Sequence, residues 1–390
     1  MKKRQGVGIF FVLYFLFWLA ENCLASYLGI FYEEKGLGGM QIAVINSTFS
    51  IAVVAAALFV GALADRISSQ RTLLVWLSAA LLLGTGLLYV SRSYAMILLS
   101  IIVYGFGYSP FNGVCDQMLM KRLEDRPELF GRLRMGGTIG AGVGVAIAGL
   151  LMRKESHFTA LFVVYWLGAG LCLLTALRLP EQTGEKQRAS LRDYLHVIQN
   201  KSFLPIYLTF VVWGFTESSV MQFQALHIVA SGLPQSFTSV FIALAMLGEA
   251  IMFALAPKLR VRLGANGLIA AAFSLQFFRV GTLAFAAWLP IPLTAFFQFT
   301  GGGAYAAVYS TLTQKISEEF PERIGCSAQN LKLVAYRGIG MTCGLMLIGA
   351  FYKAGRSDAA FSVLALCAAL AGVYYLFLSV SAKKSGAGRN

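Results

Sequence analysis

Charged residues are scarce in this chain. Only 13% of its 390 residues are Asp, Glu, Lys or Arg, whereas 57% belong to the apolar set AVILMFWYC. A soluble domain usually carries about 25% charged residues. A soluble protein of this composition would expose large apolar patches to water, so the composition excludes that class and indicates a protein solvated by lipid.

Patterns that hold metals, phosphates or catalytic nucleophiles are also missing. The six cysteines lie inside or at the ends of apolar runs without metal-ligand spacing, and we interpret them as small apolar residues. No phosphate-binding loop, His-Glu-x-x-His motif or nucleophile elbow occurs. We therefore expect no catalytic residues, no metal, no cofactor and no drive by ATP, and we predict that the protein is not an enzyme.

Long apolar runs dominate what is present. A helix that crosses a bilayer needs roughly 20 mostly apolar residues. Lipid leaves no alternative to helices or closed barrels, and the runs are too long for barrel strands. We predict an all-α integral membrane protein with twelve spanning helices, at residues 7–32, 41–64, 72–91, 94–121, 130–152, 158–179, 203–231, 237–257, 265–287, 290–316, 325–352 and 358–381.

The formal net charge of +14 is spread over short segments between the apolar runs. Lys and Arg gather in the segments on one side, beginning with Lys2, Lys3 and Arg4. This is the positive-inside pattern of membrane proteins, so we expect both termini in the cytoplasm and the chain in a bacterial inner membrane. The same pattern explains the basic charge without nucleic acid as a partner. The first run is too long for a signal peptide and is predicted to be the first span.

The runs form two sets of six. The longest polar stretch, 180–202, is the predicted linker between an N-terminal bundle, 1–179, and a C-terminal bundle, 203–390. The loop after the second span begins Gly61-Ala62-Leu63-Ala64-Asp65-Arg66, and the loop after the eighth begins Phe253-Ala254-Leu255-Ala256-Pro257-Lys258. This similarity predicts a parallel repeat, the architecture of alternating-access transporters.

Small residues recur at four-residue spacing in two of the predicted spans. They are Gly136, Gly140 and Gly144 in the fifth span, and Gly340 and Gly344 in the eleventh. Glycines at this spacing let helices approach closely in lipid. We expect them to serve helix packing rather than ligand binding.

The loop that starts at Gly61 resembles the signature of the major facilitator superfamily, which reads roughly G-x-L-A-D-R-x-G-R-R between helices two and three. Here Gly61, Asp65, Arg66 and Arg71 match the pattern, and Ser68 and Ser69 depart from it. The resemblance implies a loop that gates the contact between the two halves. The alternative is a basic cluster that only fixes topology.

A closer resemblance is to lactose permease and related oligosaccharide/proton symporters. It begins at Phe130-Gly131-Arg132-Leu133-Arg134-Met135-Gly136, which is similar to the start of that branch's fifth helix. The chain departs from the branch in helix ten, where Phe299-Thr300-Gly301-Gly302-Gly303-Ala304-Tyr305 lacks its His and Glu. The resemblance implies that Asp116 pairs with Arg134, that Glu217 and Glu249 are the acids of helices seven and eight, and that Arg279 and Arg337 are the bases of helices nine and eleven.

Ionisable residues inside spans are costly and tend to face a cavity in pairs. In the N-terminal half, Tyr108, Asn112 and Asp116 recur every four residues and share one helical face. With Arg134 they form a predicted substrate-binding surface suited to a hydroxylated ligand. The alternative is a structural ion pair that holds helix four to helix five.

In the C-terminal half we expect Glu217 to pair with Arg337, and Glu249 with Arg279. In an α-helix Lys332 and Arg337 cannot point the same way, so one could serve Glu217 and the other an anionic group of the substrate. The alternative role is to hold helices together. Further substrate-binding candidates are Gln298, Tyr305 and Tyr336, while Gly301–Gly303 is a packing or hinge site first and a substrate site second.

Glu249 and Glu21 are the candidate proton carriers, because a carboxyl in an apolar cavity can load and release protons. For Glu21 the alternative is a hydrogen bond to a neighbouring helix. The sequence thus predicts a secondary active transporter, a monomer in membrane lipid, that moves a small sugar-like or nucleoside-like solute by proton symport. The alternative is proton-driven efflux of amphipathic compounds. A membrane-embedded enzyme or solute sensor lacks any supporting motif.

Overall fold

A computed structural model of the chain describes residues 8–64, 69–123, 129–153, 158–179, 191–201, 203–320, 328 and 331–384. Over these residues the chain is almost entirely helical and contains no strand. Ten of the described helices are long and apolar enough to cross a membrane. The prediction of an all-α membrane protein is confirmed.

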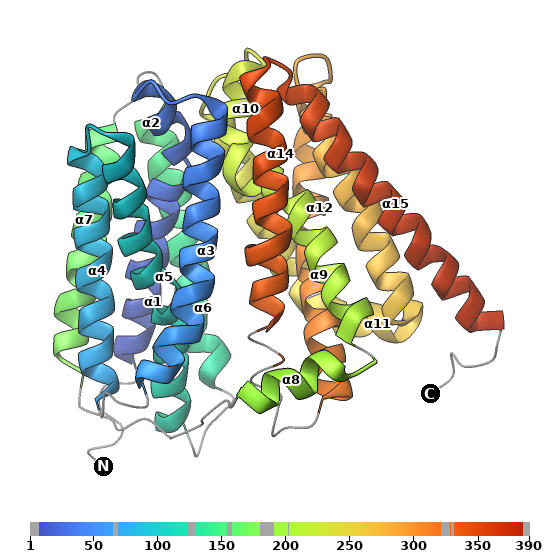
Figure 1. Cartoon of the computed structure of the whole chain (residues 1–390), viewed down its shortest axis with the longest axis horizontal. Coiled ribbons are helices and arrows are strands. Elements are labelled where there is room, and N and C mark those ends of the chain that lie inside the picture. The colour runs from blue at the N-terminus through green and yellow to red at the C-terminus, as the bar shows by residue number, and fades with distance from the viewer. Residues whose placement is uncertain are drawn as a thin grey trace. The chain divides into compact units, whose positions relative to one another are not determined.

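The chain forms two compact units, and unit 1 comprises residues 1–31 and 45–188. Figure 1 shows its long helices as a bundle in blue to green. Within it, α1 packs against α6 and α7, and α4 packs against α5 and α7. The helices of this part of the chain are α1 (Gly8–Ala25), α2 (Leu28–Glu34), α3 (Gly39–Ala64), α4 (Gln70–Val90), α5 (Tyr94–Arg122), α6 (Leu129–Leu151) and α7 (Phe158–Leu177).

Unit 2 comprises residues 32–44 and 189–390. Its helices run from green to red in Figure 1. The stretch 32–44 belongs here by its contacts, which include a hydrogen bond of 3.0 Å from the Tyr352 hydroxyl to Glu33. The other elements are α8 (Leu191–Gln199), α9 (Phe203–Ser218), η2 (Ser219–Phe223), α10 (Gln224–Ala230), α11 (Phe237–Ala284), α12 (Ile291–Glu319), η3 (Val334–Met341), α14 (Thr342–Lys353) and α15 (Ser357–Lys384).

The eighth and ninth predicted spans are joined in α11, which is 48 residues long. The predicted loop at Pro257 and Lys258 is wrong, because both residues lie within this helix. The break comes at Gly264, whose φ of 74° is a left-handed conformation that glycine adopts without steric cost. The predicted linker also contains an unexpected helix, α8.

Glycines allow the first membrane span of each half to pack closely against the fifth span of that half. In unit 1, a Cβ on Gly140 of α6 would lie 2.1 Å from the Phe15 carbonyl oxygen of α1. In unit 2, a Cβ on Gly340 of η3 would lie 2.2 Å from the Val211 carbonyl oxygen of α9. Each unit thus uses glycine to bring two backbones together, as small residues do in lipid. The matching contacts support a repeat built from two similar halves.

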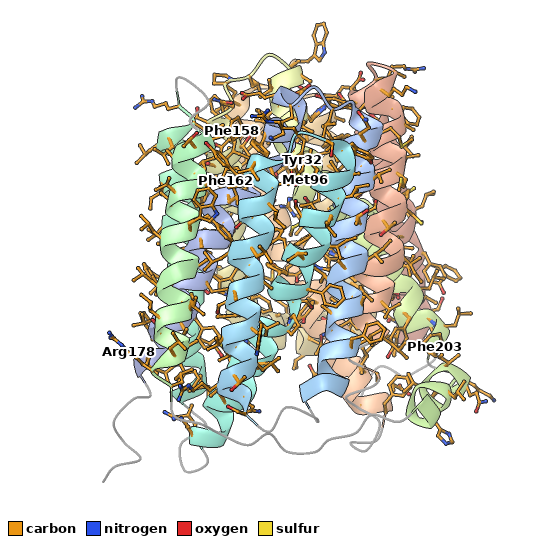
Figure 2. All side chains as sticks on the ribbon, turned by 60° about the vertical axis from the view of Figure 1, so that its left-hand side comes forward. Tyr32, Met96, Phe158, Phe162, Arg178 and Phe203 are labelled. Carbon is orange, nitrogen blue, oxygen red and sulfur yellow. The ribbon has the colours of Figure 1, made fainter. Side chains whose placement is uncertain are left out.

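The surface of α7 shows how the apolar runs are used. Leu167 and Leu174 are more than half exposed, while Phe158 and Phe162 pack on Phe31 of α2. Figure 2 places the two phenylalanines at one end of α7 and Arg178 beyond its other end. A helix that is apolar on every side and exposed on one of them is suited to lipid on that side.

The glycine contacts give the first testable prediction. Gly140→Ala should force α6 away from α1, since overpacking of this kind costs typically 1–3 kcal/mol. Gly142→Ala is the matched control, because a Cβ on Gly142 of the same helix meets nothing within 4 Å. In thermal melting of the purified protein in detergent, the first variant should melt several degrees below the second. Equal melting of the two variants would contradict the packing described.

Candidate functional site

A buried ion pair lies at the centre of unit 2. The Glu217 side chain on α9 is fully buried, and Arg279 of α11 donates to it through Nη1 at 3.1 Å. Gln276, one helical turn before Arg279, donates to the other carboxylate oxygen at 2.9 Å. Both oxygens of Glu217 therefore have donors, which is the condition under which a buried charge pair is tolerated.

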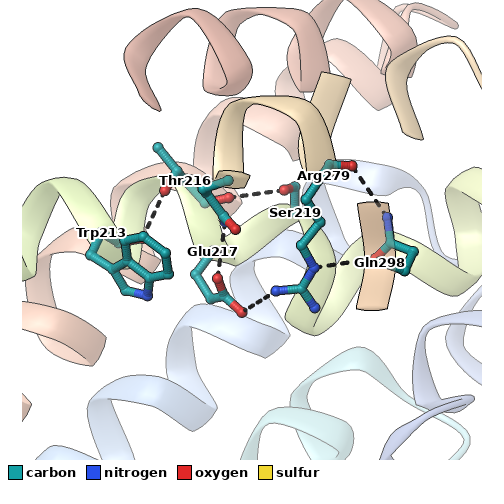
Figure 3. Close-up of polar contacts among 7 residues, drawn as sticks. Trp213, Thr216, Glu217, Ser219, Arg279 and Gln298 are labelled. Carbon is teal, nitrogen blue, oxygen red and sulfur yellow. Dashed lines mark hydrogen bonds and ion pairs between the residues drawn. The ribbon is translucent and has the colours of Figure 1, made fainter. Parts of the chain in front are cut away.

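Arg279 is held in place from α12 as well. Its Nε donates to Gln298 Oε1 at 3.2 Å, and Gln298 Nε2 donates back to the Arg279 carbonyl oxygen at 3.2 Å (Figure 3). Gly301 leaves the space that the Arg279 side chain fills, because a Cβ there would lie 2.4 Å from Arg279 Cδ. Gln298 is completely buried. Its amide group holds both the side chain and the backbone of Arg279.

The packing interpretation also holds for the rest of the Gly301–Gly303 run. A Cβ on Gly302 would lie 1.9 Å from the Ala245 carbonyl oxygen, and one on Gly303 would lie 3.2 Å from that of Gly248. This part of α12 therefore needs glycine to lie against α11. The three glycines line a helix contact within unit 2.

The predicted pairing of the bases in this unit is wrong. We predicted that Glu217 would pair with Arg337 and that Glu249 would pair with Arg279. In the structure, Arg279 forms the ion pair with Glu217. Glu249 lies within electrostatic reach of both Glu217 and Arg279. Helical spacing says which side chains share one face of a helix, but it does not say which face of another helix lies opposite. The pairing of acids and bases could therefore not be worked out from the sequence.

A second polar group in unit 2 contains aromatic rings and a lysine. Lys332 donates to the Tyr309 hydroxyl at 3.0 Å and to Thr313 Oγ1 at 3.2 Å. Tyr305 stacks on Tyr309 with ring centroids 5.5 Å apart, and Tyr336 lies 6.4 Å from Tyr305. The candidates Tyr305, Lys332 and Tyr336 are thus brought together, while Gln298 is not part of this group.

The backbone that carries Arg337 and Tyr336 is a π-helix, η3, rather than the α-helix assumed from the sequence. Its hydrogen bonds close over five residues, so each turn is wider than an α-helical turn. Lys332 and Arg337 therefore need not diverge as they would in an α-helix, because η3 lies between them and includes Arg337. A second π-segment, η2, begins two residues after Glu217. π-Segments of this kind are frequent at functional sites.

In unit 1 the structure brings Asp116 and Arg134 together as an ion pair between α5 and α6. Their side chains are 31% and 44% exposed, so the pair faces an open surface of the unit rather than its core. The Tyr14 hydroxyl of α1 donates to the second Asp116 oxygen. The guanidinium of Arg134 lies 5.8 Å from the centre of the Tyr14 ring. Tyr14 was not among the residues predicted from the sequence.

Asn112 and Tyr108 lie on the same helix as Asp116, on either side of Pro110. The Oδ1 atom of Asn112 is buried and has no hydrogen-bonding partner among the described residues. The Tyr108 ring packs near Phe17 and Phe49, with centroids 5.9 and 5.5 Å away. A buried acceptor without a donor is costly, and a donor supplied by a bound solute would remove that cost.

Glu21 of α1 is the buried acid of unit 1. The hydroxyls of Tyr104 on α5 and Tyr165 on α7 donate to its two oxygens, the latter at 2.9 Å. No cation of the described chain lies within ion-pair distance of it. These two tyrosines were not predicted from the sequence. Extending the Tyr108 and Asn112 face by one turn would have reached Tyr104.

The predicted gating loop is only partly visible. Asp65 and Arg66 lie outside the described residues. Gly61 lies near the end of α3, and Arg71 lies in the first turn of α4, where Ser69 Oγ accepts from the Thr72 backbone at 3.2 Å. Groups of three or more His, Cys, Asp or Glu placed to hold a metal do not occur in the parts of the chain that the structure describes.

Comparison with known families decides the class. The model of the MFS_1 like family matches residues 9–363, nearly the whole chain. The chain belongs to this family of the major facilitator superfamily. The resemblance stated from the sequence is thereby confirmed, and the protein is a membrane transporter rather than an enzyme.

Solved structures show the same fold at low sequence identity. A mutant of the nucleoside transporter NupG matches with a TM-score of 0.84 and 18% identity, over 95% of this chain and 99% of that one. A bacterial homolog of the human lysosomal transporter Spinster matches at 0.77 and 13%, over 98% of both chains. A POT family transporter matches at 0.77 and 10%, over 97% and 96%. Among curated proteins, none matches this chain.

The Glu217–Arg279 pair gives the second prediction, tested by a double-mutant cycle. Glu217→Gln and Arg279→Gln should each destabilise the protein by about 3–5 kcal/mol, because each leaves one buried charge unpaired. The double variant should recover much of that loss. Chemical or thermal unfolding in detergent measures the coupling between the two positions.

The pair of Arg260 and Glu318 in the same unit is the matched control, because its distance is 2.8 Å and its glutamate side chain is 50% exposed. An exposed pair couples by about 1 kcal/mol or less. Should the Glu217–Arg279 coupling be no larger than that of the control pair, the central role given to this ion pair is wrong.

Proposed function

We propose that this transporter moves a small polar solute, sugar-like or nucleoside-like, across the plasma membrane by alternating access, coupled to proton symport. Both termini lie in the cytoplasm in this proposal, as the distribution of Lys and Arg indicates. The coupling ion is H⁺, and the protein acts as a monomer in lipid without a cofactor.

One observation carries the proposal for the solute. On α5, the unsatisfied Oδ1 of Asn112 lies one turn from Asp116, whose ion pair with Arg134 is part-exposed. The Tyr108 ring lies one turn to the other side. An amide, a carboxylate, a guanidinium and an aromatic face can together bind the hydroxyls and the apolar face of a sugar ring or a nucleoside.

The matches to solved structures support the fold of a transporter. The nucleoside transporter NupG covers almost the same length of chain as this protein. At 18% identity the match shows the fold alone. The proposed solute class is therefore argued from the residues of α5 and α6. These residues are polar and charged, which favours a hydroxylated solute over the amphipathic compounds of an efflux pump.

Glu21 is the proposed proton site. It is buried in unit 1, receives two tyrosine hydroxyls and has no cation beside it among the described residues. A carboxyl in such surroundings can exist neutral or charged without breaking an ion pair. Glu217, by contrast, is already neutralised by Arg279. Glu249, the other candidate proton carrier, interacts electrostatically with both Glu217 and Arg279.

The solute site is tested by uptake into proteoliposomes. With an inward proton gradient, at least one member of a panel of sugars and nucleosides should accumulate. Asp116→Asn should lower that uptake by at least about tenfold, because it removes the charge that orients Arg134. Asp358→Asn is the control, since this carboxylate is exposed at the start of α15. Unchanged uptake by Asp116→Asn would remove Asp116 from the site.

The proton site is tested by comparing accumulation with exchange. Glu21→Gln cannot release a proton, so it should lose accumulation driven by the gradient but keep exchange of labelled for unlabelled solute. Exchange in the same variant is the internal control for folding and binding. Gradient-driven accumulation by Glu21→Gln at the wild-type level would exclude Glu21 as the proton carrier. If accumulation by the wild-type protein depends on a Na⁺ gradient and not on the pH gradient, the coupling ion is Na⁺ rather than H⁺.

The efflux alternative has its own readout. Expression in a drug-hypersensitive host should leave its sensitivity to amphipathic compounds unchanged if the solute is polar. Resistance gained on expression, without uptake of any panel member, would favour export.

A further inference from the structure

Among the residues that the structure describes, no acid lies within ion-pair distance of Lys332. Its nitrogen donates to two neutral hydroxyls, those of Tyr309 and Thr313, at 3.0 and 3.2 Å. The ion pairs of the described chain include those formed by Arg134, Arg260 and Arg279, and none of these three pairs involves Lys332. The residue begins the apolar span Leu331–Lys353, where an uncompensated charge is costly.

Three acids of unit 2, Glu217, Glu249 and Glu318, already interact with other groups of the protein. Glu217 receives Arg279 and Gln276, and Glu249 lies in the electrostatic field of the same pair. Glu318 receives two hydrogen bonds from Arg260 at the end of α12. None of these described carboxylates forms an ion pair with Lys332.

The lysine also lies against an aromatic surface. Its Nζ is 4.2 Å from the centre of the Tyr309 ring, on which Tyr305 stacks at an interplanar angle of 28°. Tyr336 adds a third ring beside Tyr305. Aromatic faces of this kind bind the flat or apolar face of a ring. A cation beside such a surface suits a ligand that carries both a ring and a negative charge.

The hydrogen bonds leave donors for that charge. An ammonium has three N–H groups, and two of those of Lys332 are used within the protein. The Tyr309 hydroxyl accepts one of them and keeps its own proton to donate. Two donors, one of them charged, therefore remain at this position, and charge-assisted hydrogen bonds to carboxylate or phosphate oxygens are among the stronger ones.

We propose that Lys332 and the Tyr309 hydroxyl bind the anionic group of a ring-bearing organic anion, while the Tyr305–Tyr309 surface takes its ring. The proposal rests on the proposed transport function and narrows the solute from polar to anionic. Carboxylate and phosphate share the chemistry that this site recognises. A sugar acid and a nucleotide are the two sources of that chemistry, and the experiment distinguishes them.

The experiment measures thermal stabilisation of the purified full-length protein, because a ligand that binds only the folded state raises its melting temperature. Matched pairs of probes are glucose with glucuronate, and uridine with uridine 5′-monophosphate. Inorganic phosphate alone tests whether the anion suffices without a ring. The anionic member of at least one pair should bind more tightly than its neutral partner by at least about tenfold.

Lys332→Gln should remove that preference. Tyr309→Phe keeps the ring under the lysine but loses the hydroxyl, so it should weaken binding of the anion without abolishing it. Lys315→Gln is the matched control, because Lys315 lies on the same α12 as Tyr309 and donates to Asn266 at 3.1 Å. It should keep the preference for the anion. Lys332→Arg, which keeps the charge, serves if the glutamine variant does not fold.

The result that overturns the proposal is binding and uptake of the neutral probe at least as strong as that of the anion, unchanged in Lys332→Gln and in Tyr309→Phe. That outcome leaves the proposed transport of a polar solute intact. Failure of every probe to bind or to enter proteoliposomes overturns the proposed function and this inference together.

Discussion

The free-energy cost of a charge in hydrocarbon governs how this protein is built. An ionised group at bilayer depth must find a partner of opposite charge, a set of strong hydrogen-bond donors or acceptors, or water. Three in-span acids of the described chain meet this requirement in three different ways. Glu217 has a buried guanidinium and an amide, Asp116 has a part-exposed guanidinium and a tyrosine, and Glu21 has two tyrosines alone. These differences suggest different roles.

The glycines serve the same constraint indirectly. Gly301 leaves room for the Arg279 side chain, and Gln298, one turn before it on α12, fixes the guanidinium. In lipid, helices gain little from burying apolar surface, so close backbone contact and polar contacts have to hold them together. The helix packing and the charge network of unit 2 therefore depend on one another. A substitution in the glycine run would disturb both.

Much of this could be predicted from the sequence. Apolar runs of fixed length gave helices close to those observed, such as α4 at Gln70–Val90 and α7 at Phe158–Leu177. The resemblance to lactose permease and its relatives placed Asp116 beside Arg134. The partner of Glu217 was missed, because it depends on which faces of α9 and α11 meet. The π-helical course of η3 was missed too, since hydrophobic periodicity does not distinguish it from an α-helix over eight residues.

Proton symport is the central proposal for this protein. It is tested most directly by recording the external pH of a lightly buffered suspension of de-energised vesicles when a transported solute is added. Symport predicts a transient alkalinisation that follows solute entry and disappears with a protonophore or in Glu21→Gln. Solute entry with no change in external pH would contradict proton coupling, whichever solute the protein carries.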